Sequence, residues 1–215
     1  MKKQKRWIAC LLALCMACFA LPAFAESASG AEALKGYGIM QGDTDGNLRL
    51  DDEITRAEAT ALIYRLHKEK DEDVATIGVS FPDMTGHWAA AEVACAKAEG
   101  LVDGTTETTF EPDKTVTLQE FLKMTVTLLG YNAQAERQGY PVGYMIVSTQ
   151  LGLTKGITSA ADANVTRGMA ADILANALDV PLMKTMDDED KTAYILMNGK
   201  DGTPLQTIRI ALEAE

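Results

Sequence analysis

Three stretches of the chain repeat apolar residues at the spacing of a helix that packs one face on a core. Each stretch follows a threonine: Thr55, Thr117 or Thr166. The apolar positions, at intervals of three and four residues, are Ala59, Leu62, Ile63 and Leu66, then Phe121, Met124 and Leu128, then Ala170, Ile173, Leu174 and Ala177. This period predicts three amphipathic helices.

A Gly-x-x-x-Gly turn precedes each of these helices at a similar distance. The turns are 38–42, 100–104 and 152–156, and from the second glycine to the threonine there are 13, 13 and 10 residues. An aromatic residue, Trp88 or Tyr140, stands 12 residues before the second and third turns. Such self-similarity predicts three copies of one helix-loop-helix unit, at residues 26–70, 80–131 and 139–179.

The first 25 residues have the pattern of a secretory signal peptide. A basic start, Lys2 to Arg6, precedes the apolar run Trp7 to Leu21 and the small-residue site Ala23-Phe24-Ala25. The apolar run is shorter than the roughly 20 residues of a membrane-spanning helix, which argues against a retained anchor. We therefore expect an exported protein, cleaved after residue 25, that is not inserted in the membrane.

Removal of residues 1–25 changes the cysteine count and the charge. Three of the four cysteines lie there, so Cys95 has no partner and the fold cannot be a disulfide scaffold. The segment holds four of the 20 basic residues and none of the 31 acidic ones, which leaves a net charge of −15. That charge argues against nucleic acid as a general partner, and any anionic ligand needs local cations.

The last segment, residues 180–215, has a different pattern. Met186–Asp190 reads as an acidic linker, and the alternating residues 192–197 and 205–210 flank a turn at 198–202. This pattern predicts a β-hairpin. A lone hairpin is marginal in water. We therefore expect it to dock on the helical units or to begin a further domain.

Several short motifs in this order resemble the S-layer homology domain. They are Phe81-Pro82-Asp83, His87-Trp88-Ala89, Gly100-Leu101-Val102-Asp103-Gly104, Phe110-Glu111-Pro112 and Thr55-Arg56-Ala57-Glu58. The resemblance implies a mainly α, pseudo-threefold domain with a central bundle of first helices and grooves between repeats that bind a cell-wall secondary polysaccharide, often with an acidic pyruvyl ketal. It also implies a secreted, non-catalytic anchoring protein of a bacterial cell wall or S-layer, with a surface lattice or surface proteins as partners.

The starts of the three predicted helices supply the first candidate ligand contacts. Thr55 with Glu58, and Thr117 with Glu120, fit capping boxes. Thr166 lacks the acidic partner, because Met169 stands there. Arg56 and Arg167 occupy the next position, where a cation is unfavourable unless an anion is near, so a ligand carboxylate could bind the guanidinium and the first-turn amides. Alternatively, Arg56 pairs on the surface with Asp51, Asp52 or Glu58.

Aromatic and acidic residues supply the remaining candidates. Trp88 and Tyr140 could stack on sugar rings or pack at the start of the first helices. Asp83 could bind sugar hydroxyls or cap the adjacent turn. Because Leu118 replaces an arginine in the second unit, we expect one or two competent grooves. One would combine Arg56 with Trp88, and another would use Arg167.

Two other functions are compatible with parts of the sequence. Residues 41–52, with Asp43, Asp45 and Gly46, resemble a calcium loop of the EF-hand or dockerin type, but Gln41 and Asp52 depart from the usual end ligands. Wall-glycan hydrolysis lacks support, because no carboxylate pair is placed by a motif and His67 and His87 lie in separate units. We expect no catalytic residue, metal or cofactor.

Overall fold

The computed structural model describes residues 23–67, 81–185, 194–196 and 206–214. In these residues the protein is mainly helical, as predicted. The segments 26–70, 80–131 and 139–179 are called segments 1, 2 and 3 below. Among the described residues, no helix is long and apolar enough to cross a membrane.

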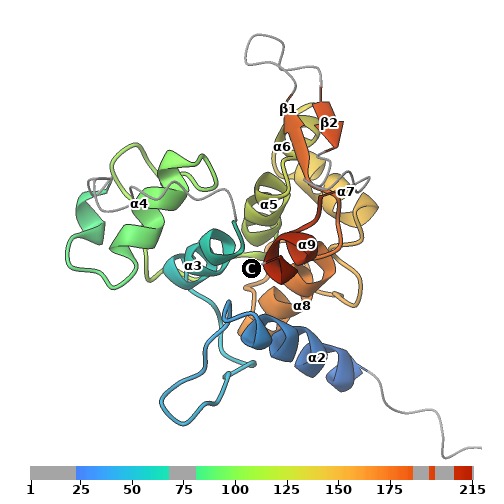
Figure 1. Cartoon of the computed structure of the whole chain (residues 1–215). Coiled ribbons are helices and arrows are strands. Elements are labelled where there is room, and N and C mark those ends of the chain that lie inside the picture. Colours follow the sequence, from blue (N-terminus) through green and yellow to red (C-terminus); the bar gives the residue numbers. More distant parts are fainter. Residues whose placement is uncertain (1–22, 68–80, 186–193, 197–205, 215) are drawn as a thin grey trace, which may run out of the picture.

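Each segment contributes a first and a second helix (Figure 1). Segment 1 has α2 (Ala23–Gly36) and α3 (Arg56–Leu66), segment 2 has η2 (Pro82–Met84), α4 (Ala90–Ala98) and α5 (Leu118–Leu128), and segment 3 has α7 (Val142–Gln150) and α8 (Arg167–Ala177). A short helix that the sequence pattern did not predict, α6 (Asn132–Glu136), joins segments 2 and 3. Residues 1–22 of the predicted signal peptide lie outside the described residues, and α2 begins at Ala23, before the expected cleavage site.

The second helices begin where the capping residues predict. The Oγ1 of Thr55 accepts the amide of Glu58, whose Oε2 accepts the amide of Thr55 at 3.0 Å. Thr117 and Glu120 form the second capping box. The Oγ1 of Thr166 accepts the amide of Met169 without a reciprocal bond. These caps satisfy amides that would otherwise lack a partner in the first turn.

The three segments meet in a closed ring of backbone hydrogen bonds just before the second helices. Ile54 donates to Val165 at 2.9 Å, Val165 to Val116 at 2.9 Å, and Val116 to Ile54 at 3.1 Å. All three side chains are fully buried. Each segment thus gives one hydrogen bond and receives one around a common axis.

The first-turn amides extend this ring outward. Arg56 and Ala57 donate to carbonyls of Lys114 and Pro112 in segment 2, at 2.9 and 3.0 Å. The same pattern recurs in Leu118 and Gln119, which donate to Ala163 and Ala161, and in Arg167 and Gly168, which donate to Asp52 and Leu50. These amides were expected to be free for an anion. That expectation was wrong, because a loop of another segment binds them.

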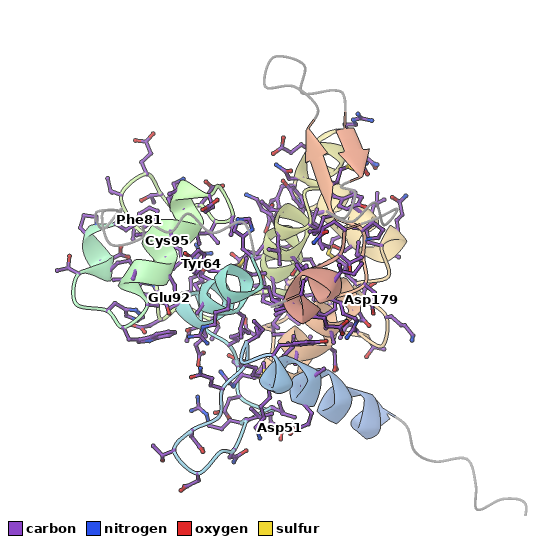
Figure 2. All side chains as sticks on the ribbon, in the orientation of Figure 1. Asp51, Tyr64, Phe81, Glu92, Cys95 and Asp179 are labelled. Atoms are coloured by element: carbon purple, nitrogen blue, oxygen red, sulfur yellow. The ribbon has the colours of Figure 1, made fainter. Side chains whose placement is uncertain are left out.

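The second helices lie at the centre and the first helices outside. Helix α5 contacts both α3 and α8, while α2 packs on α8, α4 on α3 and α7 on α5 (Figure 1). Figure 2 shows Tyr64 of α3 beside Glu92 and Cys95 of α4 at one of these outer contacts. The expected central bundle of first helices was therefore wrong. The hydrogen-bonded ring directly precedes the second helices, so these start at the axis.

The predicted hairpin of residues 192–210 does not form. Strand β2 (Tyr194–Leu196) pairs antiparallel with β1 (Met183–Thr185), and Ile208–Glu213 is helix α9. Thr207 explains the difference, because its Oγ1 accepts the amide of Ile210 at 3.2 Å and begins the helix. The expected linker at 186–190 and turn at 198–202 lie outside the described residues.

The C-terminal elements that form in place of the predicted hairpin dock on the helical segments. The amide of Met183 donates to Leu129 at 3.0 Å, directly beside Gly130. From α9, Arg209 binds Asp179 through Nη2 at 3.0 Å and the hydroxyl of Tyr37 through Nη1 at 3.2 Å. The C-terminal elements therefore connect the ends of α2, α5 and α8.

Candidate functional site

A cavity of about 330 Å³ lies where the three segments meet beside α5. It is lined from α3 and the segment 2 loop by Arg56, Gly100, Leu101, Val102, Asp103, Gly104, Thr105 and Lys114, from α5 by Glu120, Lys123, Met124 and Thr127, and from segment 3 by Tyr140. Its volume is at the lower end of the range for small-ligand sites. The site is a mixture of cations, carboxylates and one exposed aromatic ring.

Arg56 forms one wall of this cavity and holds segment 2 in place. Its Nε donates to the carbonyl of Phe110 at 2.9 Å and its Nη2 to that of Asp103 at 3.0 Å. The guanidinium also lies 4.8 Å from the centre of the Phe110 ring. Burial lowers the pKa of Arg56, and the charge of Glu120 opposes this effect. The Nη1 group has no hydrogen-bond partner among the described residues, so it can donate to a ligand.

Lys123 and Tyr140 form another part of the cavity wall. The Lys123 ammonium lies 5.8 Å from the centre of the Tyr140 ring and 6.0 Å from that of Tyr144, within the range of cation-π attraction. It also lies 3.6 Å from the carboxylate of Asp103. Burial and the charge of Glu120 raise the pKa of Tyr140, so its hydroxyl keeps its proton at neutral pH.

The cavity has more positive than negative groups, although the whole chain is acidic. Arg56, Lys114 and Lys123 oppose Asp103 and Glu120. A monoanionic ligand would therefore meet a local positive charge in a protein whose formal net charge is −11. This matches the expectation that an anion needs local cations.

Arg167 has the same geometry as Arg56 at another junction, but it is enclosed. Its Nε donates to Leu48 at 2.8 Å and its Nη2 to Gln41 at 2.9 Å, while Nη1 binds Glu58 at 3.1 Å. The residue is only 7% exposed. All three nitrogens are bound within the protein, so Arg167 holds segment 1 against segment 3 and is not available as Arg56 is.

The third junction, between segments 2 and 3, is apolar at the positions of the arginine and the capping glutamate. Leu118, at the place of the arginines, is buried, and Met169, at the place of the capping glutamates, packs against the core. Arginine and glutamate are therefore absent together, which explains both departures in the sequence.

The structure brings Arg56 together with Tyr140, whereas Trp88 does not line this cavity. Trp88 is 58% exposed and lies beside the His87 ring, with ring centres 5.5 Å apart. The expected combination of Arg56 with Trp88 was therefore wrong. The first helix of each segment packs on another segment, so the aromatic residue comes from segment 3.

Asp83 has a role that neither sequence interpretation included. Its carboxylate accepts the amides of Phe110 and Glu111 at 3.0 and 2.8 Å. Desolvation raises its pKa, but these amides and the charge of Arg56 outweigh that effect, so the pKa is below its usual value. Asp83 fixes the loop whose carbonyl binds Arg56, and Glu111 there has a φ of 59°.

Lys114, Lys123 and Asp103 are cavity residues that the sequence analysis did not select. Lys123 could have been found, because it follows Glu120 by three residues and so lies on the same helix face. The candidate residues Thr55, Glu58, Thr117 and Thr166 serve as helix caps at the ring.

The resemblance to a calcium loop is explained by local hydrogen bonds. The Oδ1 of Asp43 accepts the amides of Asp45 and Asn47, and the side chain of Asn47 accepts that of Arg49. In the part of the chain that the structure describes, no group of three or more acidic, histidine or cysteine side chains could hold a metal.

Comparison with known proteins decides the family. The model of the S-layer homology domain matches residues 25–60 and 80–122, which include the start of α3, the Gly100–Gly104 turn and the start of α5. The chain belongs to the S-layer homology family. The two matched stretches contain Arg56 and most of the other residues that line the cavity.

Several relatives of this S-layer homology protein are named as surface or cell-wall proteins. It is 27% identical to "Cell surface protein" of Thermoanaerobacter kivui over 89% of this chain and 25% of that protein. It is 30% identical to "Middle cell wall protein" of Brevibacillus brevis over 72% of this chain and 15% of that protein. It is 31% identical to "Cellulosome-anchoring protein" of Acetivibrio thermocellus over 51% of this chain and 24% of that protein.

The chain spans a quarter or less of the length of these relatives. The family match and the surface-protein relatives place this S-layer homology protein outside the cell, at the bacterial cell wall or surface layer. This confirms the expected localisation.

Proposed function

We propose that this protein is a non-catalytic anchor that binds an anionic cell-wall polysaccharide in the cavity between α3, α5 and Tyr140. The observation that carries the proposal is the group of Arg56, Lys123 and Tyr140 around one open cavity. Arg56 Nη1 and Lys123 would bind a carboxylate, and the Tyr140 ring would stack on the face of a sugar. The names of the cell-wall and cellulosome-anchoring relatives support this function.

One main binding groove follows from the differences between the junctions. Arg167 is enclosed by its own hydrogen bonds, and the third junction has Leu118 and Met169 in place of charged groups. The proposal therefore gives ligand contact to Arg56, Tyr140 and the cavity lysines. It gives structural roles to Arg167, Asp83, Glu58 and the three capping threonines. Segment 3 is included as a third copy of the repeat because it completes the hydrogen-bonded ring.

Two exposed aromatic residues allow a matched test. Tyr140 is 49% exposed and lines the cavity, whereas Trp88 is 58% exposed and does not. We expect Tyr140→Ala to weaken cosedimentation with purified cell walls by up to about tenfold, because a stacked aromatic contributes about 0.5–1.5 kcal/mol. Trp88→Ala should bind as the unmodified protein does.

Walls stripped of their secondary polymer provide the second arm of the experiment. Sedimentation of the unmodified protein should be lost with that polymer and should remain on untreated walls. Equal loss of binding in the Tyr140→Ala and Trp88→Ala proteins would contradict the assignment to this cavity. Sedimentation with stripped walls would contradict the ligand class, and release of reducing sugar from the walls would contradict a non-catalytic role.

A further inference from the structure

Lys123 differs from the other cavity cations in the way that its charge is balanced. Its partner Asp103 is shared with Lys97, whose Nζ lies at 2.9 Å, nearer than the 3.6 Å of Lys123. The side chain of Asp103 is 68% exposed at the cavity wall. The hydrogen bond from Lys97 is the main cause that lowers the pKa of Asp103, so the carboxylate is charged at neutral pH.

We propose that Asp103 is an internal counter-ion, that a ligand carboxylate replaces it at Lys123, and that Lys123 is thereby the residue that selects a charged saccharide over a neutral one. This inference rests on the proposed function and adds the residue that determines specificity.

The exchange leaves no charge unbalanced. When Lys123 turns to the ligand, Asp103 keeps its closer partner Lys97. The backbone carbonyl of Asp103 remains bound to Arg56 throughout. The pair of Lys123 and Asp103 is solvent-exposed on both sides and 3.6 Å apart, so breaking it costs little.

The other two cations are less suited to this role. Arg56 has two of its nitrogens committed to carbonyls of segment 2, so its guanidinium is fixed. Lys114 pairs at 3.3 Å with Glu111, which does not line the cavity. Of these three cations, only Lys123 forms an ion pair with a carboxylate that lines the cavity, among the described residues. Its ammonium also lies near the Tyr140 and Tyr144 rings.

The experiment compares two probes and several full-length variants. The probes are purified wall polymer and the same polymer with its carboxyl groups chemically reduced to alcohols, which leaves any phosphate unchanged. We expect Lys123→Met to lose about tenfold in affinity for the native polymer, since one charge-assisted contact corresponds to about 1.4 kcal/mol. Its affinity for the reduced polymer should not change, so the preference for carboxylate disappears.

Three further variants separate charge recognition from packing. Lys123→Arg should keep the preference for the native polymer. Asp103→Asn should bind the native polymer about threefold more tightly, because the competing carboxylate is gone. Lys35→Met removes a comparably exposed lysine that pairs with Glu32 outside the cavity, and it should bind normally.

The outcomes distinguish this inference from the proposed function. If the unmodified protein prefers the carboxylated polymer and Lys123→Met keeps that preference, the role of Lys123 is overturned and the anchoring function stands. Weaker binding by Asp103→Asn would make Asp103 a ligand contact and would also overturn the exchange. If the unmodified protein binds neither polymer, the proposed function itself fails.

Discussion

Replacing Arg167 by leucine tests the idea that arginine and capping glutamate form one unit at a segment junction. In the structure, Arg167 joins α8 to Glu58 and to two loop carbonyls of segment 1. The third junction has Leu118 and Met169 at the same two positions. The protein therefore contains both a charged and an apolar version of one contact.

The expected cost follows from what each change leaves behind. Arg167→Leu removes the nearer cation from Glu58 at a mostly buried site and leaves only Arg49, 3.8 Å away. We expect a cost of about 3 kcal/mol, at the low end for a broken buried pair because Glu58 is partly exposed and keeps this second partner. Glu58→Met leaves Arg167 uncompensated and also removes the cap on α3, for a similar total of about 3 kcal/mol.

The double variant Arg167→Leu with Glu58→Met should cost much less than the sum of the two. It loses only the cap and the hydrogen bonds to the carbonyls of Leu48 and Gln41, about 1 kcal/mol each. The two single variants lose about 3 kcal/mol each and the double variant loses about 3 kcal/mol in total. The coupling energy between the two residues is therefore about 3 kcal/mol, at the upper limit for contacting residues.

Urea unfolding followed by circular dichroism measures these values, with the slope m as a check that unfolding remains two-state. Glu58→Gln, which keeps an acceptor for the amide of Thr55, isolates the charge. If the two single changes add to within about 0.5 kcal/mol, or if Arg167→Leu alone costs less than about 1 kcal/mol, the reasoning fails.

Three further predictions concern other contacts. Folding lowers the pKa of Asp83, so its contribution to stability is complete above about pH 4 and is lost as the pH falls through the folded-state pKa. Between about pH 5 and 2, the melting temperature of Asp83→Asn should therefore fall less than that of the unmodified protein. Equal falls would contradict this. Gly130→Ala should lower the free energy of unfolding, measured in urea, by over about 2 kcal/mol, because its Cβ would lie 1.9 Å from the carbonyl oxygen of Met183. Gly152→Ala has a similar φ but open space around the Cβ, so it should cost only about 1 kcal/mol. Equal costs would exclude the clash. Arg209→Ala should speed amide exchange in 208–213 and leave wall binding unchanged, and unchanged exchange would show that its contacts do not hold α9.

Local signals in the sequence located the helices well. The second helices begin directly after Thr55, Thr117 and Thr166. A capping threonine and the apolar stripe that follows it lie within a few turns of one another, so both are visible in the local sequence. The hairpin prediction was wrong because it overlooked such a capping signal. Residues 205–210 alternate as a strand does, but the cap at Thr207 begins a helix there.

The partners of the site residues could not be predicted, because they depend on how the segments pack. Spacing placed Arg56 near a groove but could not show that Tyr140, from segment 3, shares that groove. It also could not show that Asp83 binds the amides of Phe110 and Glu111, 27 and 28 residues away. The cavity is made by contacts between segments, which no single repeat contains.

The ring of Ile54, Val116 and Val165 has no first or last member, because every segment donates to one neighbour and accepts from the other. A protein cut down to two segments would therefore keep one bond of the ring and present an open donor at one edge and an open acceptor at the other. Such a fragment is complementary to the missing segment, so the two pieces should reassemble when mixed. The same open edges would let two truncated copies exchange segments and form a dimer.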